Sequence, residues 1–430
     1  MKDSEIIGEL ARCVKCGQCK SVCPVYRITR QEQFLARGKL ALCESLLRGK
    51  LAPSPQLRTI LDSCMKCYQC VADCPTGIHP VHLILSVRKR LRGGGLKALL
   101  TRLLMQTIIP NRRRYDLLMQ AMRLSQKLLP KRAGSTRHLP LLFENKMAIP
   151  ELTRRTALRI LPEKTGGGKK RVGLFLGCLI NYVYPEIALS TVDLLELTGH
   201  TVIIPKSQVC CGIPALYLGD TAAFQRLRSK NIRSFRAFKL DAIVTACASC
   251  GTALKQEYGR TEMGASKQVQ GETLPLGAKV YDISEFLADK SFLAGGKKEK
   301  VTYHDPCHLR FSQGIWREPR KILSQVAEIA ETDEAWRCCG GGGTFSLFFH
   351  KLSRAIGEEK CKALQETGAR TVVTACPGCI LQLKGILSDT LPVRHVVEVI
   401  SEKCINETAK LSCNIDPAQS VFIRGKGSVS

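Results

Sequence analysis

The 430-residue sequence has no run of about 18 apolar residues, so no transmembrane helix is predicted. It contains no G-x-G-x-x-G fingerprint of a dinucleotide site, and no Lys-Ser/Thr follows the four glycines at 340–343. Acidic residues are few, with 37 Asp and Glu against 65 Lys and Arg. We therefore expect neither a membrane-spanning chain nor a nucleotide or flavin bound to this chain itself.

Features of secreted proteins are also missing. The start, Met1 to Glu5, carries an acidic pair and no apolar core, unlike a signal peptide. Disulfide frameworks are typical of short secreted chains, whereas this chain is long enough for two or three domains. We therefore expect its 22 cysteines to stay reduced in the cytoplasm and to bind metal.

Two compact cysteine runs with the spacing Cys-x2-Cys-x2-Cys-x3-Cys-Pro lie near the N-terminus. They comprise Cys13, Cys16, Cys19, Cys23 and Pro24, then Cys64, Cys67, Cys70, Cys74 and Pro75. Bacterial two-cluster ferredoxins have this spacing, and the fourth cysteine of each run ligates the other cluster. Zinc knuckles are the alternative, but they commonly use two separated Cys-x2-Cys pairs. The sequence therefore predicts one [4Fe–4S] cubane on Cys13, Cys16, Cys19 and Cys74, and a second on Cys64, Cys67, Cys70 and Cys23.

Two longer patterns in the C-terminal half contain a Cys-Cys-Gly triplet. The first comprises Cys178, Cys210, Cys211, Cys247 and Cys250, and the second Cys307, Cys338, Cys339, Cys376 and Cys379. Each has five thiols, one more than a cubane needs, which suggests that one thiolate bridges two irons. Gly212 and Gly340 are expected at positive φ beside the crowded pair. Zinc on four of the five thiols, or an empty site, is the alternative.

The two long patterns also indicate an internal duplication. Equivalent cysteines are offset by 129, 128 and 129 residues, and DAIVTACASCGTALK at 241–255 corresponds to RTVVTACPGCILQLK at 370–384. Short apolar strands at 172–176, 201–204 and 242–245 alternate with helical patterns such as 186–198. Strands that alternate with helices predict parallel sheets. Residues 33–50 have helical periodicity, with Cys43 as a buried small side chain.

We expect an α+β multidomain protein. Its parts are a mainly helical ferredoxin-like domain at 1–92, a basic helical linker at 93–170, two duplicated α/β lobes at 171–295 and 296–412, and a flexible tail at 413–430. The glycines at 166–168 are interpreted as a linker. Cys361, Cys404 and Cys413 lie outside every motif and are expected to have no role in the sites. His304 and His308 flank Cys307 and are expected to form local hydrogen bonds.

Positive charge is concentrated in one segment. Residues 85–140 contain 14 Lys and Arg and a single acid, Asp116, which gives a net charge of +13. Two amphipathic helices, broken at Pro110 and Asn111, are predicted within 96–137. Their leucine face is interpreted either as packing on the cluster domain or as part of a surface that contacts an acidic partner or an anionic membrane. Tyr115 is the only aromatic residue at 85–137, so nucleic-acid binding is not expected.

The Cys-Cys-Gly patterns resemble the cysteine-rich CCG domain of the heterodisulfide reductase catalytic subunit. Similar patterns occur in the iron–sulfur subunits of glycolate oxidase, lactate utilisation proteins and anaerobic glycerol-3-phosphate dehydrogenase. Local strings agree, at 303–309 (YHDPCHL) and 338–345 (CCGGGGTF). Two ferredoxin runs followed by two CCG repeats most closely resemble the glycolate oxidase iron–sulfur subunit family, over nearly the whole chain.

This resemblance implies a noncubane [4Fe–4S] cluster in one or both CCG repeats, held by the five cysteines of each. It implies an electron-transfer subunit of a glycolate or lactate dehydrogenase, with FAD on a partner flavoprotein and a quinone or other carrier as acceptor. The expected location is the cytoplasm, with peripheral contact at the inner face of the cell membrane. The alternatives are a heterodisulfide reductase-like catalytic subunit, a glycerol-3-phosphate dehydrogenase subunit, and a redox-sensing or zinc scaffold protein.

Overall fold

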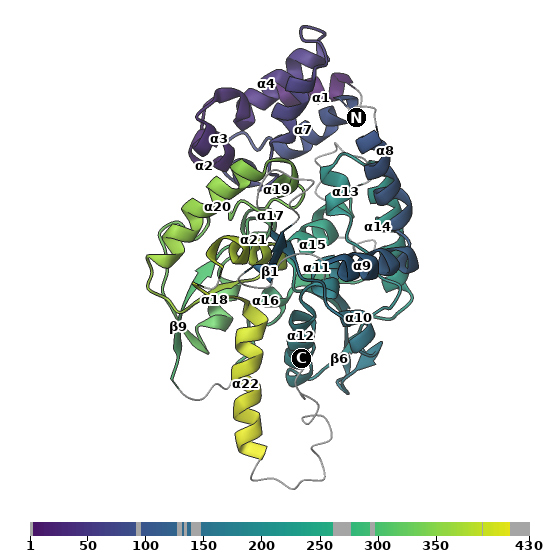
Figure 1. Ribbon diagram of the computed structural model, residues 1–430, viewed down its shortest axis with the longest axis vertical. Coiled ribbons are helices and arrows are strands. Elements are labelled where there is room, and N and C mark those ends of the chain that lie inside the picture. Colours follow the sequence, from purple (N-terminus) through teal and green to yellow (C-terminus); the bar gives the residue numbers. More distant parts are fainter. Residues whose placement is uncertain are drawn as a thin grey trace.

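The protein is described by a computed structural model, which covers residues 3–91, 96–126, 131–132, 136–138, 148–260, 277–292, 297–388 and 390–412. Figure 1 shows the N-terminal helices α1 to α7 at one end of the molecule, above two α/β lobes. None of the helices in these ranges is long and apolar enough to cross a bilayer. The segment after 412, expected to be a flexible tail, lies outside the described residues.

The N-terminal region is mainly helical, as predicted. Its elements are α1 (Asp3–Ala11), α2 (Cys19–Val22), α3 (Pro24–Thr29), η1 (Glu32–Phe34), α4 (Ala36–Leu47), α5 (Pro55–Asp62), α6 (Gln69–Ala72), α7 (Pro80–Arg88) and η2 (Lys89–Leu91). Ser54 caps α5 by accepting a hydrogen bond of 3.1 Å from the amide of Leu57. Cys43 is fully buried in the small core of this region, together with Ile6 and Leu61.

The basic segment contains the two predicted helices. They are α8 (Leu96–Leu103), which continues into the π-helical turn η3 (Leu104–Ile108), and α9 (Arg112–Gln126). The break between them falls at Pro110 and Asn111, as expected. A three-stranded antiparallel sheet follows, with β1 (Lys131–Arg132), β2 (Thr136–His138) and β3 (Ala148–Pro150), and then α10 (Ala157–Ile160).

Most leucines on the apolar face of these two helices are exposed and do not pack on the cluster domain. Leu99, Leu103 and Leu117 are between 51% and 66% exposed, and Leu100 and Leu124 are 55% exposed. The buried side chains that anchor the segment to the main core are Met105, in the π-helical turn, and Ile109, just after it. Leu104 and Tyr115, which are partly buried, pack against the same core. The interpretation of this face as a purely packing surface is therefore wrong for most of its described leucines.

The first lobe is built on a five-stranded sheet in the order β4-β6-β5-β7-β8. Its strands are β4 (Lys164–Thr165), β5 (Lys170–Phe175), β6 (His200–Ile203), β7 (Ala242–Thr245) and β8 (Lys279–Asp282). Its helices are α11 (Gly177–Tyr182), α12 (Pro185–Leu197), α13 (Ile213–Tyr217), α14 (Thr221–Arg236), α15 (Ala248–Thr252), the π-helical η4 (Ala253–Glu257) and α16 (Ile283–Phe286). All pairings are parallel except that of β4 with β6.

The glycines at 166–168 connect β4 to β5 at this sheet and are not a linker between domains. β4 pairs with β6, and the carbonyl oxygen of Gly168 accepts a hydrogen bond of 2.7 Å from Thr201 Oγ1. A Cβ atom on Gly166 or Gly168 would overlap the backbone at Gly199 and His200. Glycine is therefore required here for the close approach of two backbone segments.

The second lobe has a four-stranded parallel sheet in the order β10-β9-β11-β12. Its strands are β9 (Glu299–His304), β10 (Ala327–Ile329), β11 (Thr371–Thr374) and β12 (Val393–His395). Its helices are α17 (Cys307–Gln313), α18 (Glu318–Leu323), α19 (Phe345–Phe348), α20 (His350–Gln365), α21 (Pro377–Leu387) and α22 (Val396–Ser412).

The strand orders confirm the duplication that the sequence predicted. β6-β5-β7-β8 of the first lobe corresponds to β10-β9-β11-β12 of the second, and β4 is an added edge strand. Cysteines follow the carboxyl ends of equivalent strands in both lobes: Cys178 after β5, Cys247 after β7, Cys307 after β9 and Cys376 after β11. The carboxyl ends of neighbouring parallel strands meet at one sheet edge, so the topology gathers these thiols.

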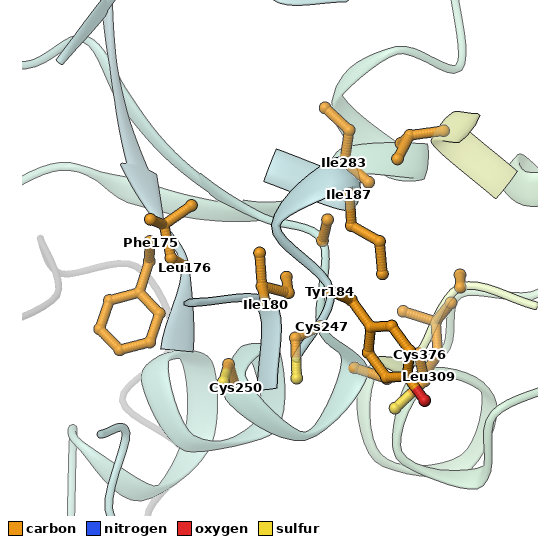
Figure 2. Packing of buried hydrophobic residues seen from close by; sticks show 14 of the residues in the cluster. Phe175, Leu176, Ile180, Tyr184, Ile187, Cys247, Cys250, Ile283, Leu309 and Cys376 are labelled. Carbon is orange, nitrogen blue, oxygen red and sulfur yellow. The ribbon is translucent and has the colours of Figure 1, made fainter. Parts of the chain in front are cut away.

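The lobes share one hydrophobic core, which contains residues of both sheets and most of the CCG cysteines. Figure 2 shows Cys247 and Cys250 of the first lobe and Cys376 of the second among apolar side chains such as Ile180 and Leu309. Helix α22 of the second lobe packs against α12 of the first. The cysteine-rich edges of the two sheets therefore lie in a shared, apolar interior.

Candidate iron–sulfur sites

The first compact run borders a cavity together with the last cysteine of the second run. Cys13, Cys16, Cys19 and Cys74 all line this cavity, and so does Cys70 of the second run. Lys15 and Gly17 have φ of 55° and 88°, so the backbone turns sharply between the cysteines. The arrangement brings together the four thiols predicted for one cubane, on a loop whose turns point thiols inward.

The second run repeats this geometry. Lys66 and Tyr68, which stand at the positions of Lys15 and Gly17, have φ of 57° and 63°. Burial raises the pKa of Cys70, and the neighbouring thiols of Cys67, Cys64 and Cys23 raise it further, which places these sulfurs close together. The four thiols predicted for the second cubane are therefore neighbours. Four neighbouring thiolates would repel one another, and a cationic metal core would compensate their charge.

The side chain of Lys66, which lies between Cys64 and Cys67 in the second run, is buried, and 2% of the residue's surface is exposed. Burial lowers its pKa to about 7, and the nearby Arg88 contributes in the same direction. Its Nζ lies 5.5 Å from the centre of the Tyr217 ring, where the ring's negative face stabilises a cation. Sequence spacing gave no signal for this contact, because Tyr217 belongs to the first lobe.

The five thiols of the first lobe form a chain of sulfur–sulfur hydrogen bonds. The chain runs Cys178, Cys210, Cys211, Cys250, Cys247. Hydrogen bonds from Cys210 and Cys250 lower the pKa of Cys211 to about 5, so this thiol is the one most readily ionised.

Two glycines are required at the first-lobe set. Gly212 has φ of 91°, as predicted for the residue after the Cys-Cys pair. Gly177 has φ of 73°, and a Cβ atom there would lie 2.6 Å from the sulfur of Cys250. Both positions therefore favour glycine for conformational reasons, and at Gly177 the sulfur also fills the space that a side chain would occupy.

The second lobe repeats the arrangement. Its sulfurs are hydrogen-bonded in the order Cys307, Cys338, Cys339, Cys379, Cys376, and Gly340 has φ of 85°. Hydrogen bonds from Cys338 and Cys379 hold the pKa of Cys339 well below its usual range. Lys360 Nζ donates hydrogen bonds to the carbonyl oxygens of Glu334 (2.8 Å) and Ala335 (3.1 Å), just before the Cys-Cys pair, and so fixes the approach to it.

The four thiol sets are connected to one another. Cys247 of the first lobe and Cys376 of the second are hydrogen-bonded, which lowers the pKa of Cys376 and raises that of Cys247. After burial, the thiol of Cys307 is the main cause that raises the pKa of Cys67, so the second run borders the second lobe. In space the sets follow one another as first run, second run, second lobe and first lobe. This order differs from the order along the sequence.

His308 joins the three parts of the molecule at this point. Its Nε2 lies 2.9 Å from the carbonyl oxygen of Lys66 and 3.2 Å from the hydroxyl of Tyr217, and its Nδ1 lies 2.8 Å from Ser249 Oγ. Its partners are thus distant in sequence, whereas local hydrogen bonds were expected. Only the tertiary structure identifies this histidine as a junction residue.

His304 also differs from the expectation of a locally hydrogen-bonded side chain. It is fully buried, and neither ring nitrogen has an oxygen or nitrogen partner among the described residues. Its ring nitrogen and the Sγ atoms of Cys339 and Cys379 lie within 4.8 Å of one another. The three remaining described cysteines, Cys43, Cys361 and Cys404, are buried in hydrophobic clusters, and Cys413 lies outside the described residues.

Known families match the same segments. The family described as "Cysteine-rich domain" (CCG) matches residues 172–255 and 301–384, and the "4Fe-4S dicluster domain" family matches residues 9–78. These three segments contain all 18 cysteines of the four sets.

Several curated proteins are similar to this chain. A probable glycolate oxidase iron–sulfur subunit of Bacillus subtilis is 29% identical over 426 residues, which cover 94% of this chain and 96% of that protein. Lactate utilization protein A of a Geobacillus species is 32% identical over 241 residues, which cover 54% of this chain and 100% of that protein. One subunit of the fumarate reductase (CoM/CoB) of Methanothermobacter marburgensis is 34% identical over 221 residues, 50% of this chain and 42% of that protein.

The likeness to the first of these relatives extends over nearly the full length of both chains, and the likeness to the second covers all of that protein. The order of a dicluster domain followed by two CCG domains agrees with the resemblance seen in the sequence. The chain therefore belongs to the glycolate oxidase iron–sulfur subunit family of cysteine-rich CCG-domain proteins.

Proposed function

We propose that this chain is the electron-transfer subunit of an FAD-linked glycolate or lactate dehydrogenase. The observation that carries the proposal is the unbroken series of thiol sets, linked through Cys67 and Cys307 and then through Cys376 and Cys247. A chain that only bound structural zinc has no need to place four sets in sequence across a buried interior. A partner flavoprotein oxidises the hydroxy acid, and this chain passes electrons on to a quinone or another carrier.

The proposed ligands are the 18 cysteines in four sets. Cys13, Cys16, Cys19 and Cys74 hold one cubane, and Cys64, Cys67, Cys70 and Cys23 hold the second. Cys178, Cys210, Cys211, Cys247 and Cys250 hold a noncubane cluster, as do Cys307, Cys338, Cys339, Cys376 and Cys379. When bound, each cluster accepts and releases single electrons at a potential set by its type, charge, hydrogen bonds and exposure. The limits 1–92, 296–412 and 413–430 are kept as proposals, whereas the limit between 93–170 and 171–295 moves, because β4 (Lys164–Thr165) already belongs to the first-lobe sheet.

The chain's own residues fix the thiols and exclude water from them. Lys15 and Lys66 have positive φ, so the backbone turns sharply between successive cysteines in each loop. The first-lobe sulfurs Cys210, Cys211 and Cys250 are at most 6% exposed, and so are the second-lobe sulfurs Cys338, Cys339, Cys376 and Cys379. Burial of this kind lowers the local dielectric and limits access of oxidants to the thiolates.

The basic face is proposed to contact the flavoprotein or an anionic membrane surface. A groove of about 590 Å³ lies between η3, α9 and α14, and four cations line it: Arg114, Arg226, Lys230 and Arg233. The exposed leucines of α8 and α9 lie on the same helices. Such a combination of cations and exposed apolar side chains suits an acidic partner or the inner face of the cell membrane, with the protein itself in the cytoplasm. Nucleic acid is not a proposed partner.

Arg112 does not belong to this face, although it is the direct neighbour of Arg113 and Arg114 in the sequence. Its guanidinium forms an ion pair with Asp116 at 3.1 Å and lies 5.3 Å from the centre of the Tyr182 ring. The hydroxyl of Tyr182 donates a hydrogen bond of 2.7 Å to the same Asp116. Arg112 thus packs inward, over the first lobe.

The function is tested by reconstitution. The isolated chain should not reduce a dye with glycolate or lactate, because it has no flavin fingerprint, and addition of the flavoprotein should restore dye reduction. Dithionite-reduced chain mixed with a soluble quinone analogue should reoxidise without the flavoprotein. Substrate-dependent dye reduction by the isolated, flavin-free chain would refute the proposed division of labour.

One observation favours a second candidate, disulfide reduction as in heterodisulfide reductase. Cys178 and Cys210 border a small cavity that Arg112, Tyr115 and Tyr182 also line. A small substrate that entered it would lie beside two sulfurs of the first-lobe set. Viologen-linked reduction of a low-molecular-weight disulfide by the isolated chain would favour this candidate over the first.

A further inference from the structure

The two lobes differ at one position beside their cysteine sets. His304 is the last residue of β9, and Phe175 is the last residue of β5. His304 pairs in register with Thr374 of β11, and Phe175 pairs with the equivalent Thr245 of β7. The two side chains therefore occupy corresponding places in the duplicated fold, 129 residues apart.

In the first lobe this place is apolar. The Phe175 ring lies 5.7 Å from the ring of Phe235, centre to centre, and Phe175 is fully buried. Figure 2 shows Phe175 at the end of its strand, in the same hydrophobic cluster as Cys247 and Cys250. No hydrogen bond to a sulfur can come from a phenylalanine side chain.

In the second lobe the same place holds a buried imidazole. His304 is fully buried, and within the described part of the chain no oxygen or nitrogen accepts from or donates to its ring. A buried polar group without a partner destabilises the folded protein, so a partner for this ring is expected. A ring nitrogen of His304 and the sulfurs of Cys339 and Cys379 lie within 4.8 Å of one another, so a thiol sulfur is within reach of the ring.

We propose that His304 donates a ring N–H hydrogen bond to the sulfur of Cys339 and thereby makes the second-lobe site electronically different from the first-lobe site. The inference rests on the proposed function, since it concerns the metal group that Cys339 would hold. His304 acts through Cys339 and is a positioning residue. It is not a member of the predicted ligand set.

The consequence concerns the reduction potential. A hydrogen bond to a thiolate sulfur stabilises the more negatively charged, reduced form of an iron–sulfur group, and hydrogen bonds to sulfur are among the factors that set cluster potentials. His304 therefore raises the potential of the second-lobe site. The first lobe, with Phe175, has no counterpart of this effect. In the order of thiol sets the second-lobe site lies between the two compact runs and the first lobe. The raised potential therefore belongs to a site within the series of thiol sets and not at its end.

Three variants separate the hydrogen bond from simple packing. His304→Phe copies the residue of the first lobe and removes the donor. His304→Gln keeps an N–H donor in a smaller side chain. Tyr303→Phe is the matched control, because Tyr303 is the preceding residue of β9, is fully buried, and carries a hydroxyl without a partner among the described residues. Adjacent strand residues face opposite sides of a sheet, so the side chains of Tyr303 and His304 leave β9 on opposite faces.

The measurements are a redox titration followed by electron paramagnetic resonance, and hyperfine spectroscopy on protein labelled with [15N]histidine. We expect His304→Phe to move one midpoint potential to a lower value, His304→Gln to restore part of it, and Tyr303→Phe to leave it unchanged. In the labelled wild-type protein we expect a weak 15N coupling that His304→Phe removes. The labelled wild-type sample needs no substitution, so the test survives a variant that does not fold.

Three results would overturn the proposal: no 15N coupling, a strong coupling typical of direct metal ligation, or a potential that His304→Phe does not change. Iron and zinc are counted in the same samples, so zinc in the second lobe would count against the proposed function itself. In that case the hydrogen bond is tested with 113Cd in the site. A 113Cd resonance that shifts in His304→Phe and not in Tyr303→Phe supports the donor, and an unshifted resonance refutes it.

Discussion

The phenol of Tyr68 donates a hydrogen bond of 3.0 Å to Oε1 of Glu257, a carboxylate that is 3% exposed. Tyr68 lies inside the second compact run, and Glu257 ends the π-helical turn η4 of the first lobe. His82 Nε2 lies 3.0 Å from the same oxygen, and Arg260 lies 3.8 Å from the other. Burial raises the pKa of Glu257. The three neighbours lower it by a larger amount, so the pKa of this carboxyl is below its ordinary value; they are His82, Arg260 and Tyr68. The N-terminal region and the first lobe thus meet at a buried, charged group.

Removing the hydroxyl of Tyr68 tests this junction. Tyr68→Phe leaves the packing and takes one hydrogen bond from a buried carboxylate, which costs about 1.5–3 kcal/mol. We expect a lower urea midpoint for loss of the iron–sulfur absorption, with the cluster content of the folded protein unchanged. Tyr26→Phe, in α3 and away from this junction, is the control. Equal midpoints for Tyr68→Phe and the wild type would show that the contact does not stabilise the junction.

Asp282 gives a pH-dependent prediction. Its side chain caps α16 by accepting a hydrogen bond of 2.8 Å from the amide of Ser284, and burial raises its pKa to about 7 from a usual 3.8. Because the folded-state pKa is raised, its favourable contribution is complete below about pH 3.8 and is lost as the pH rises toward 7. Asp282→Asn keeps the capping oxygen and cannot ionise.

We therefore expect Asp282→Asn to gain stability relative to the wild type as the pH rises from 5 to 8, by at most about 3 kcal/mol. Denaturant midpoints measured across this range check the difference. Asp289→Asn, at an exposed position, is the control. A difference between Asp282→Asn and the wild type that stays constant with pH would contradict the raised pKa.

The crossed ligand sets predict which cluster each cysteine supports. Cys74 lines the cavity of Cys13, Cys16 and Cys19. Cys74→Ser should therefore damage the cluster of the first run and spare that of Cys64, Cys67 and Cys70, as followed by electron paramagnetic resonance. Cys404→Ala, in α22, controls for loss of an uninvolved thiol. Loss of the second-run signal in Cys74→Ser would show that the ligands do not cross.

Metal content checks the number of sites. Protein purified without oxygen should contain about sixteen iron atoms, four in each of four clusters. About eight iron atoms without zinc would mean that only the two compact runs are loaded. Two or more zinc atoms per chain would contradict the noncubane assignment of the CCG repeats.

The basic groove predicts a salt-dependent contact. Replacing Arg114, Arg226 and Arg233 by glutamate reverses the charge of three groove residues. Binding to the flavoprotein, or to vesicles that contain anionic lipid, should weaken several-fold, most visibly at low salt, because exposed charges are screened over about 8 Å at physiological ionic strength. Cluster content should not change.

The control is a double variant, Lys297→Glu and Lys300→Glu, because both positions are exposed on the second lobe. Reduced binding to the flavoprotein alone would identify the groove as a protein contact, and reduced binding to vesicles alone as a membrane contact. If binding to the flavoprotein and to vesicles is unchanged at every salt concentration, the three arginines have no role in either contact.

Much of the fold and of the ligand sets follows from local sequence. Cysteines two residues apart can reach one metal group through a single turn of backbone, so Cys13 to Cys19 and Cys64 to Cys70 are recognisable without a structure. Gly212 and Gly340 have the positive φ that the crowded Cys-Cys pairs predicted. The duplication is visible because each copy must repeat the same strand, turn and thiol spacing.

The rest depends on contacts between distant segments, which no local pattern encodes. Only the packing of the two sheets brings Cys247 beside Cys376, and only the docking of the N-terminal helices places Lys66 against His308. Arg112 and Arg114 are close together in the same basic segment, but Asp116 and Tyr182 hold Arg112 inward. Local spacing thus determined which thiols act together, whereas the tertiary structure decided the order of the sites and which sulfur faces His304. The physical reason is that a ligand set can be closed by a short loop, while burial and neighbouring partners arise only when separate segments pack.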